Sequence, residues 1–132
     1  MPTTILNFAH PLTPAHLDQI RTQREGLEIA RVIEIPTHFT DDAPYEGQLP
    51  ALVDRAGLTS PEWQTVPLLV NPPGYAPITA ALLAYIHGLR GEFPELIRLT
   101  RAPDQPGVYV VSGLIPLQSI RDAGRVARVE GM

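Results

Sequence analysis

The chain has 132 residues, a formal net charge of −4, no cysteine and no lysine. Without cysteine, disulfides, iron–sulfur clusters and thiolate zinc sites are excluded, and without lysine so are P-loop and Schiff-base lysines. The negative charge argues against broad binding to duplex nucleic acid. No apolar run is long enough for a membrane span and no secretory signal opens the sequence. We therefore expect a cytoplasmic protein with a single domain over residues 1–132.

In the first half of the chain, short apolar runs alternate with helix signals. Two β-branched, apolar runs predict strands over residues 3–9 and 27–35. Between them, Thr13 and Pro14 are typical of the first residues of a helix. The polar segment 37–48 predicts a loop, and a short helix is expected over 49–56, with a proline near its start and a glycine after its end.

The second half continues this alternation. A single capped helical turn is expected at residues 60–63, followed by an almost wholly apolar strand. The strongest helix signal of the sequence, a segment rich in Ala and Leu, comes next. Two strands and a polar helix follow it. The predicted ranges are a strand at 66–71, a helix at 76–90, strands at 95–100 and 108–114, and a helix at 117–129.

Alternating strands and helices predict a Rossmann-like α/β fold, in which a mostly parallel sheet of about five strands carries helices on both faces. The connection between the last two strands is too short for a parallel crossover, which takes a dozen residues or more. The last two strands are therefore expected to form an antiparallel hairpin.

Ligands of open α/β sheets bind outside the carboxyl ends of the parallel strands. Three loops that lead into helices are candidates, at residues 7–13, 71–75 and 115–119. Unpaired N–H groups at helix N-termini favour anions, so an acidic protein without lysine can still bind phosphate. The residues expected to contact a ligand are Asn7, Phe8, Ala9, His10, Thr13, Asn71, Pro73, Gly74, Tyr75 and Gln118.

Each principal candidate has two interpretations. His10 either contacts a phosphate and transfers protons, or orders the turn before a helix. Asn71 either reads a base edge or holds its turn, and Tyr75 either stacks on an adenine or covers a helix N-terminus. No histidine spacing indicates a metal site, so neither a metal nor another cofactor is expected.

The remaining polar candidates are expected to be structural or solvated. His87 is expected to lie at the surface or in packing, and His16 has no convincing catalytic partner. The Asp41–Asp42 pair is interpreted as a solvated loop. Arg98 and Arg101 flank the predicted hairpin. Arg101 is expected to have a solvated surface role, with contact to a phosphate as the alternative.

Several runs resemble a family of small accessory proteins of type III CRISPR loci. They are ILNFAHPLTP at 5–14, EWQTVPLLVNPPG at 62–74, ALLAYIHG at 81–88 and FPELIRL at 93–99. The resemblance implies a CRISPR-associated Rossmann-like fold and a cyclic oligoadenylate ligand, most often cyclic tetra-adenylate. The family often has Ser where this chain has Ala9, so a hydroxyl that could bind phosphate is missing here.

The resemblance also implies a role in antiviral signalling, in which the protein lowers the level of free ring by sequestering it or cleaving it slowly. An efficient metal-independent ring nuclease, with His10 as the proton-transfer group and a 2′,3′-cyclic phosphate product, is the alternative. A protein-interaction module without a nucleotide ligand is a second alternative. A homodimer with the ring on its two-fold axis is expected, with higher assembly left open, and loop 37–48 is either a lid or a dimer contact.

Overall fold

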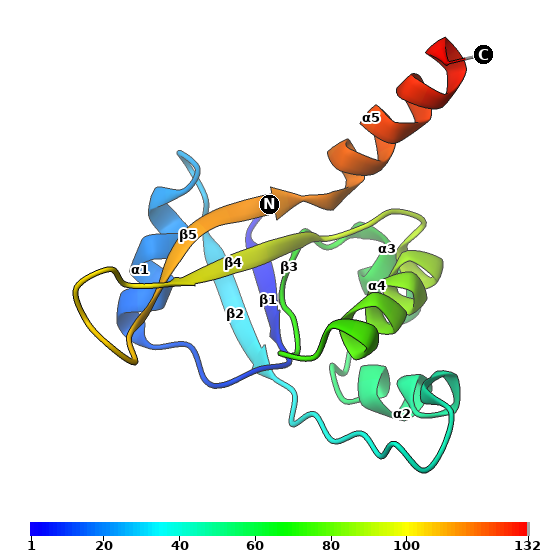
Figure 1. Ribbon diagram of the computed structural model, residues 1–132, viewed down its shortest axis with the longest axis horizontal. Helices are drawn as coiled ribbons and strands as arrows, with labels where there is room; N and C mark the ends of the chain where they lie inside the picture. The colour runs from blue at the N-terminus through cyan, green and yellow to red at the C-terminus, as the bar shows by residue number, and fades with distance from the viewer. Residues whose placement is uncertain (132) are drawn as a thin grey trace.

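The computed structural model describes residues 1–131, so of the expected domain only Met132 lies outside the described residues. Its five-stranded sheet has the order β2-β1-β3-β4-β5 (Figure 1). The strands are β1 Thr3–Asn7, β2 Ile29–Glu34, β3 Leu68–Asn71, β4 Glu95–Arg101 and β5 Tyr109–Pro116. Strands β1 to β4 pair in parallel, and β5 is antiparallel to β4. The predicted mostly parallel Rossmann-like sheet with a final hairpin is confirmed.

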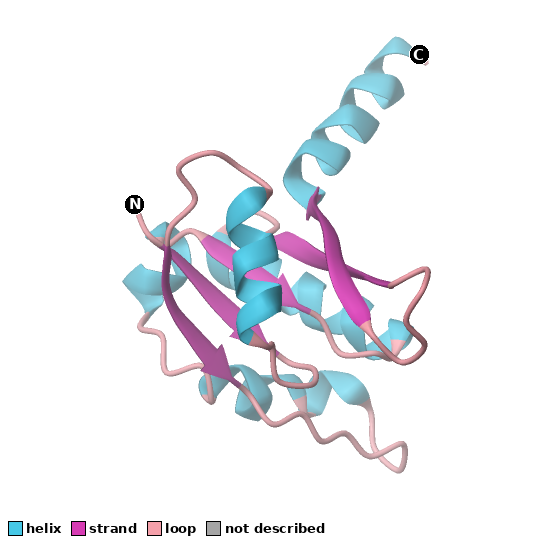
Figure 2. Cartoon of the chain, turned by 90° about the vertical axis from the view of Figure 1, so that its left-hand side faces the viewer, coloured by secondary structure: helices cyan, strands magenta, loops and turns pink. Residues whose placement is uncertain are grey.

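Helices cover both faces of the sheet, as predicted. Helix α1 packs on one face, whereas α2, α3 and α4 pack on the other (Figures 1 and 2). The helices are α1 Pro14–Thr22, α2 Leu49–Asp54, α3 Ser60–Thr65, α4 Ala76–Arg90 and α5 Leu117–Glu130. Several predicted element ends differ from the structure by one or two residues; for example, β1 ends at Asn7 rather than at residue 9, and β2 begins at Ile29 rather than at residue 27. Helix α3 extends beyond a single turn, and a short 3₁₀ helix, η1, forms at Tyr45–Gly47 within the expected loop.

Proline and threonine set where several helices begin. Helices α1 to α4 each carry a proline at their first or second position, where the missing N–H costs no hydrogen bond. Thr13 caps α1 and Thr59 caps α3, and each forms a reciprocal capping box with the residue three positions later. In α3, the hydrogen bond from the Thr59 backbone N–H keeps the pKa of Glu62 below its usual range.

Two apolar clusters lie on opposite faces of the sheet. Successive strand residues point to opposite faces, so Ile5 packs with the α1 side and Leu6 with the α4 side. Leu69 and Val70 of β3 divide in the same way. Every residue of β1 and β3 is buried, including Thr3, Thr4, Asn7 and Asn71, so these strands are covered on both faces.

The sheet opens beyond the end of β3. Strand β3 pairs with β4 only through Leu69 and Val70, which face Glu95 and Leu96. Strand β4 continues to Arg101 paired with β5 alone. On the outer side of β5, the Val111 N–H donates to Gln19 Oε1 of α1 at 2.7 Å. The β4–β5 hairpin is thus tied to α1 while it separates from β3.

Helix α5 projects away from the sheet (Figures 1 and 2). None of its residues is buried, and Ile120, Val126 and Val129 are exposed. Its first turn is attached to the body, because Leu117 packs against the α4-side cluster and Gln118 Oε1 accepts a hydrogen bond from the Phe93 N–H at 2.9 Å. Within residues 1–131, no helix combines the length and apolarity needed to cross a membrane.

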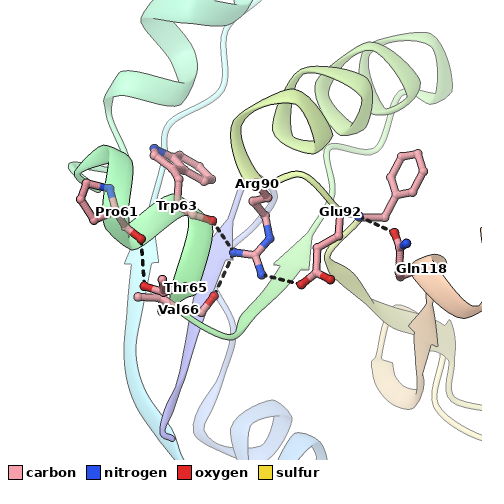
Figure 3. Close-up of polar contacts among 8 residues, drawn as sticks. Pro61, Trp63, Thr65, Val66, Arg90, Glu92 and Gln118 are labelled. Atoms are coloured by element: carbon pink, nitrogen blue, oxygen red, sulfur yellow. Dashed lines mark hydrogen bonds and ion pairs between the residues drawn. The ribbon is translucent and has the colours of Figure 1, made fainter.

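Arg90 joins the end of α4 to α3 through a nearly buried guanidinium (Figure 3). Its Nη1 donates to the carbonyl oxygens of Trp63 and Val66, at 2.8 and 2.9 Å. Its Nη2 lies 3.5 Å from the exposed carboxylate of Glu92. Burial lowers the pKa of Arg90, but an arginine stays charged at neutral pH.

Replacing Arg90 should destabilise the fold far more than replacing Glu92. Arg90→Leu leaves the carbonyls of Trp63 and Val66 without their donor, so we expect a loss of about 3 kcal/mol in the free energy of unfolding. Glu92→Gln removes only the exposed partner and should change it by less than about 0.5 kcal/mol. Urea unfolding of both variants provides the measurement, and equal effects would contradict this role of Arg90.

Candidate functional site

A cavity of about 910 Å³ lies at the carboxyl ends of β1 and β3, next to the part of β4 that runs beyond β3. Residues 8–12 line one side, residues 71–75 another, and residues 96–99 of β4 a third. We call this cavity the strand-end pocket. It occupies the edge at which open α/β sheets bind ligands.

The side chain of Asn7 organises the loops around the strand-end pocket. It is fully buried at the end of β1. Its Oδ1 accepts hydrogen bonds from the Ala9 N–H at 3.0 Å and from Asn71 Nδ2 at 2.9 Å. Its Nδ2 donates to the His10 carbonyl at 2.9 Å and to Glu34 Oε2 at 2.8 Å. All four hydrogen-bonding positions of the amide are filled, so Asn7 holds three strand ends together rather than facing a ligand.

Asn71, by contrast, keeps unused hydrogen-bonding capacity. Because the Ala9 N–H can only donate, the Asn7 atom that it meets is the oxygen, and the Asn71 atom bound to that oxygen is the amide nitrogen. Asn71 Oδ1 therefore points elsewhere, and within residues 1–131 it has no hydrogen-bond partner. Asn71 lines the pocket, where this oxygen can accept a hydrogen bond from an amine such as that of adenine.

The two histidines of the pocket differ in how their rings are used. His16 Nδ1 accepts a hydrogen bond from the Thr13 N–H at 3.1 Å, and Nε2 lies 2.8 Å from the Tyr109 carbonyl, to which it must donate. His16 is thus held as the neutral tautomer with its proton on Nε2. The exposed ring of His10 makes no hydrogen bond within residues 1–131, so it remains available to a ligand.

Helix α4 begins at the pocket rim. Tyr75 is its N-cap residue, but the side chain makes no capping hydrogen bond and is 52% exposed. The Thr79 hydroxyl donates to the Pro73 carbonyl at 2.8 Å and fixes the preceding turn. The first N–H groups of α4 and the Tyr75 ring thus lie together at the rim, where the helix dipole favours an anion and the ring offers a stacking surface.

Most of the predicted contact residues come together here. The members of the predicted set that line the strand-end pocket are Phe8, Ala9, His10, Asn71, Pro73, Gly74 and Tyr75. Thr13 lies outside the lining and caps α1. Gln118 lies at the opposite edge, bound to Phe93, because the antiparallel β5 carries its end away from the carboxyl ends of the other strands. The third predicted loop, residues 115–119, is therefore not part of this rim. Of its residues, only Ile115 lines the pocket.

The loop after β2 also contributes. Thr37 and Phe39 line the strand-end pocket. The loop is shaped by Gln48, whose Oε1 accepts from the Thr40 N–H at 3.0 Å and whose Nε2 donates to the Thr40 carbonyl at 2.9 Å. Beyond Phe39, a second cavity of about 720 Å³ holds three carboxylates, and its only residue shared with the strand-end pocket is Tyr75. Its acidic lining is unfavourable for phosphate.

Sequence reasoning missed Arg98, which lines the pocket from β4. Its position alternates with Ile97 and Leu99, so a strand pattern alone indicates only that it faces away from the α1-side cluster. The departure of β4 from β3 is what opens that side to the cavity. No short-range signal in the sequence announces this separation.

Comparison of the chain with known protein families, with curated proteins and with solved structures found no match. Within residues 1–131, no three His, Asp or Glu side chains gather in a way that could hold a metal ion. The site is thus defined by its own geometry, as a cavity with neutral hydrogen-bonding groups, one free imidazole, an exposed aromatic ring and one arginine.

Asn7 should be critical for stability, whereas His10 should not. Asn7→Ala removes the partners of four hydrogen-bonding groups, at least one of them buried, so we expect a loss of about 3 kcal/mol in the free energy of unfolding. His10→Ala removes an exposed ring and keeps the carbonyl that Asn7 binds, so a change below about 0.5 kcal/mol is expected. Chemical unfolding of the two variants tests the contrast, and a mild Asn7→Ala phenotype would refute it.

Proposed function

We propose that the strand-end pocket binds a cyclic oligoadenylate, in particular cyclic tetra-adenylate, and that the protein lowers type III CRISPR signalling by holding the ring or cleaving it slowly. The observation that carries the proposal is the combination at one rim of donors for phosphate and groups for adenine. The free N–H groups of α4 suit phosphate, while Tyr75 and the Asn71 amide oxygen suit the base. The ring itself is taken from the resemblance of the sequence runs described above.

The side chains available favour holding over rapid cleavage. Cleavage would proceed by attack of a ribose 2′-hydroxyl on the adjacent phosphorus, with the 5′-oxygen leaving and a 2′,3′-cyclic phosphate formed. The hydroxyl must lose a proton and the leaving oxygen must gain one. His16 is occupied at both nitrogens, so His10 is the one lining imidazole free for either transfer. Geometry and charge stabilisation alone would support a slow reaction.

A homodimer would complete the site. Pockets for small ligands measure roughly 300–1,000 Å³, and the strand-end pocket falls within this range. A ring of four adenylates carries four bases and four phosphates, more than one such pocket encloses. Two copies related by a two-fold axis would present every lining group twice to a ring with the same symmetry. We propose this arrangement for the bound state.

Ligand binding and turnover are tested together with labelled cyclic tetra-adenylate, excess protein and EDTA, by native gel and chromatography. We expect a shifted band with intact ring, and slow linear product at most. Tyr75→Ala should weaken binding by about 10- to 100-fold, because one stacked base contributes ~1–3 kcal/mol, whereas Tyr75→Phe keeps the ring and should bind normally.

Rapid formation of a linear product would instead establish the efficient ring nuclease, with His10→Ala as the variant expected to slow it. No shift and no product with rings of any size would overturn the proposal. The interaction module without a nucleotide ligand would then be the remaining hypothesis.

The mass of the complex tests the dimer. Sedimentation velocity with saturating ring should give a species of two chains per ring, or a whole-number multiple of it, because each ring is expected to meet two pockets. Measurement without ring shows whether the dimer exists beforehand. A complex of one chain with one ring would contradict the two-fold arrangement while leaving ring binding intact.

A further inference from the structure

Arg98 occupies the stretch of β4 that has separated from β3. Strand β3 ends at Asn71, and the paired positions end at Leu96, so Arg98 has no strand beside it on that side. It lines the strand-end pocket together with Leu96, which shares its face of the strand. Arg98 and the loop that starts α4 thus line the same pocket.

The residue paired with Arg98 on β5 carries no side chain. This residue is Gly113, and directly paired residues present their side chains on the same face. A Cβ added at Gly113 would meet no atom within 4 Å. The space that a side chain would fill next to Arg98 is therefore open, and the guanidinium is exposed.

No carboxylate within residues 1–131 forms an ion pair with Arg98. Five other arginines form ion pairs with carboxylates, namely Arg21, Arg24, Arg31, Arg90 and Arg121. Within residues 1–131, Arg98 forms none, and it is the only arginine that lines the pocket. The chain contains no lysine, so Arg98 is the only permanently cationic side chain among the described lining residues.

We propose that Arg98 binds a phosphate of the ligand in the strand-end pocket, an assignment that rests on the proposed function. The planar guanidinium donates two parallel hydrogen bonds to phosphate oxygens, a geometry that an ammonium group cannot offer. The neutral donors at the start of α4, at the rim of the same pocket, bind the same group. One anionic group of the ring is thereby held between a full positive charge and a helix N-terminus.

Arg101 provides a matched control. It lies on the same strand, is exposed, lines no part of the pocket and forms no ion pair within residues 1–131. Arg98→Ala and Arg101→Ala therefore change the net charge equally, but only the first removes a group from the pocket. Arg98→Lys keeps the charge but loses the planar guanidinium that donates two parallel hydrogen bonds. Arg98→Gln provides a second neutral variant, with a longer side chain than alanine.

The experiment measures the dissociation constant of labelled cyclic tetra-adenylate from about 50 to 500 mM salt, after circular dichroism has established that each variant is folded. Arg98→Ala and Arg98→Gln should weaken binding by about 10- to 100-fold at low salt. They should also lower the slope of log K against log salt by about 0.7 or more, the value per phosphate contact for single strands. The affinity of Arg98→Lys should lie between that of these two variants and that of the natural protein, and its salt slope should equal that of the natural protein. Arg101→Ala should leave both quantities unchanged.

The outcomes separate this assignment from the proposed function. If the natural protein binds no ring, the proposed function fails and the role of Arg98 fails with it. If the natural protein binds but Arg98→Ala and Arg98→Gln bind equally well with the same salt slope, only the role of Arg98 is overturned. An equal loss in Arg101→Ala would also overturn it, because the effect would then come from overall charge.

Discussion

The buried carboxamide of Asn7 is the interaction on which the candidate site depends. It joins the ends of β1 and β3 through Asn71, reaches Glu34 at the end of β2, and fixes the turn that carries His10. A buried amide with four partners has one orientation in which every donor meets an acceptor. The loops that border the strand-end pocket therefore share one rigid anchor. Loss of that anchor would release the strand ends and leave several groups without partners.

The pocket itself results from an incomplete sheet. Strand β3 stops at Asn71 while β4 continues beside β5, and the hairpin is tied to α1 by Gln19. The part of β4 with which a longer β3 would have paired instead lines the cavity, and Arg98 lies in that part. In a protein with a net charge of −4, an anion is best received by such local donors. The proposed anion binding thus relies on a few groups rather than on a basic surface.

The two histidines of the strand-end pocket differ in whether their rings are free, and this difference limits the acid–base chemistry of the site. His16 is fixed as a neutral ring between the α1 cap and β5, and His10 is free. One free imidazole and one arginine agree better with the proposed holding of a phosphodiester than with rapid acid–base catalysis, which commonly uses a proton donor and a proton acceptor at once. None of the described residues of helix α5, by contrast, lines the pocket, and Ile120, Val126 and Val129 of this helix are exposed.

The sequence by itself determined the alternation of elements, the hairpin and the limits of α4, because apolar periodicity, prolines at helix starts and connection length are local properties. It also indicated seven residues of the pocket, since strand ends and helix starts can be located in the chain. Only the tertiary structure decided that Asn7 is an internal anchor, that Gln118 lies at the far edge, and that Arg98 faces the cavity. These three assignments depend on strand direction and on where two strands separate, which are set by long-range packing rather than by neighbours in sequence.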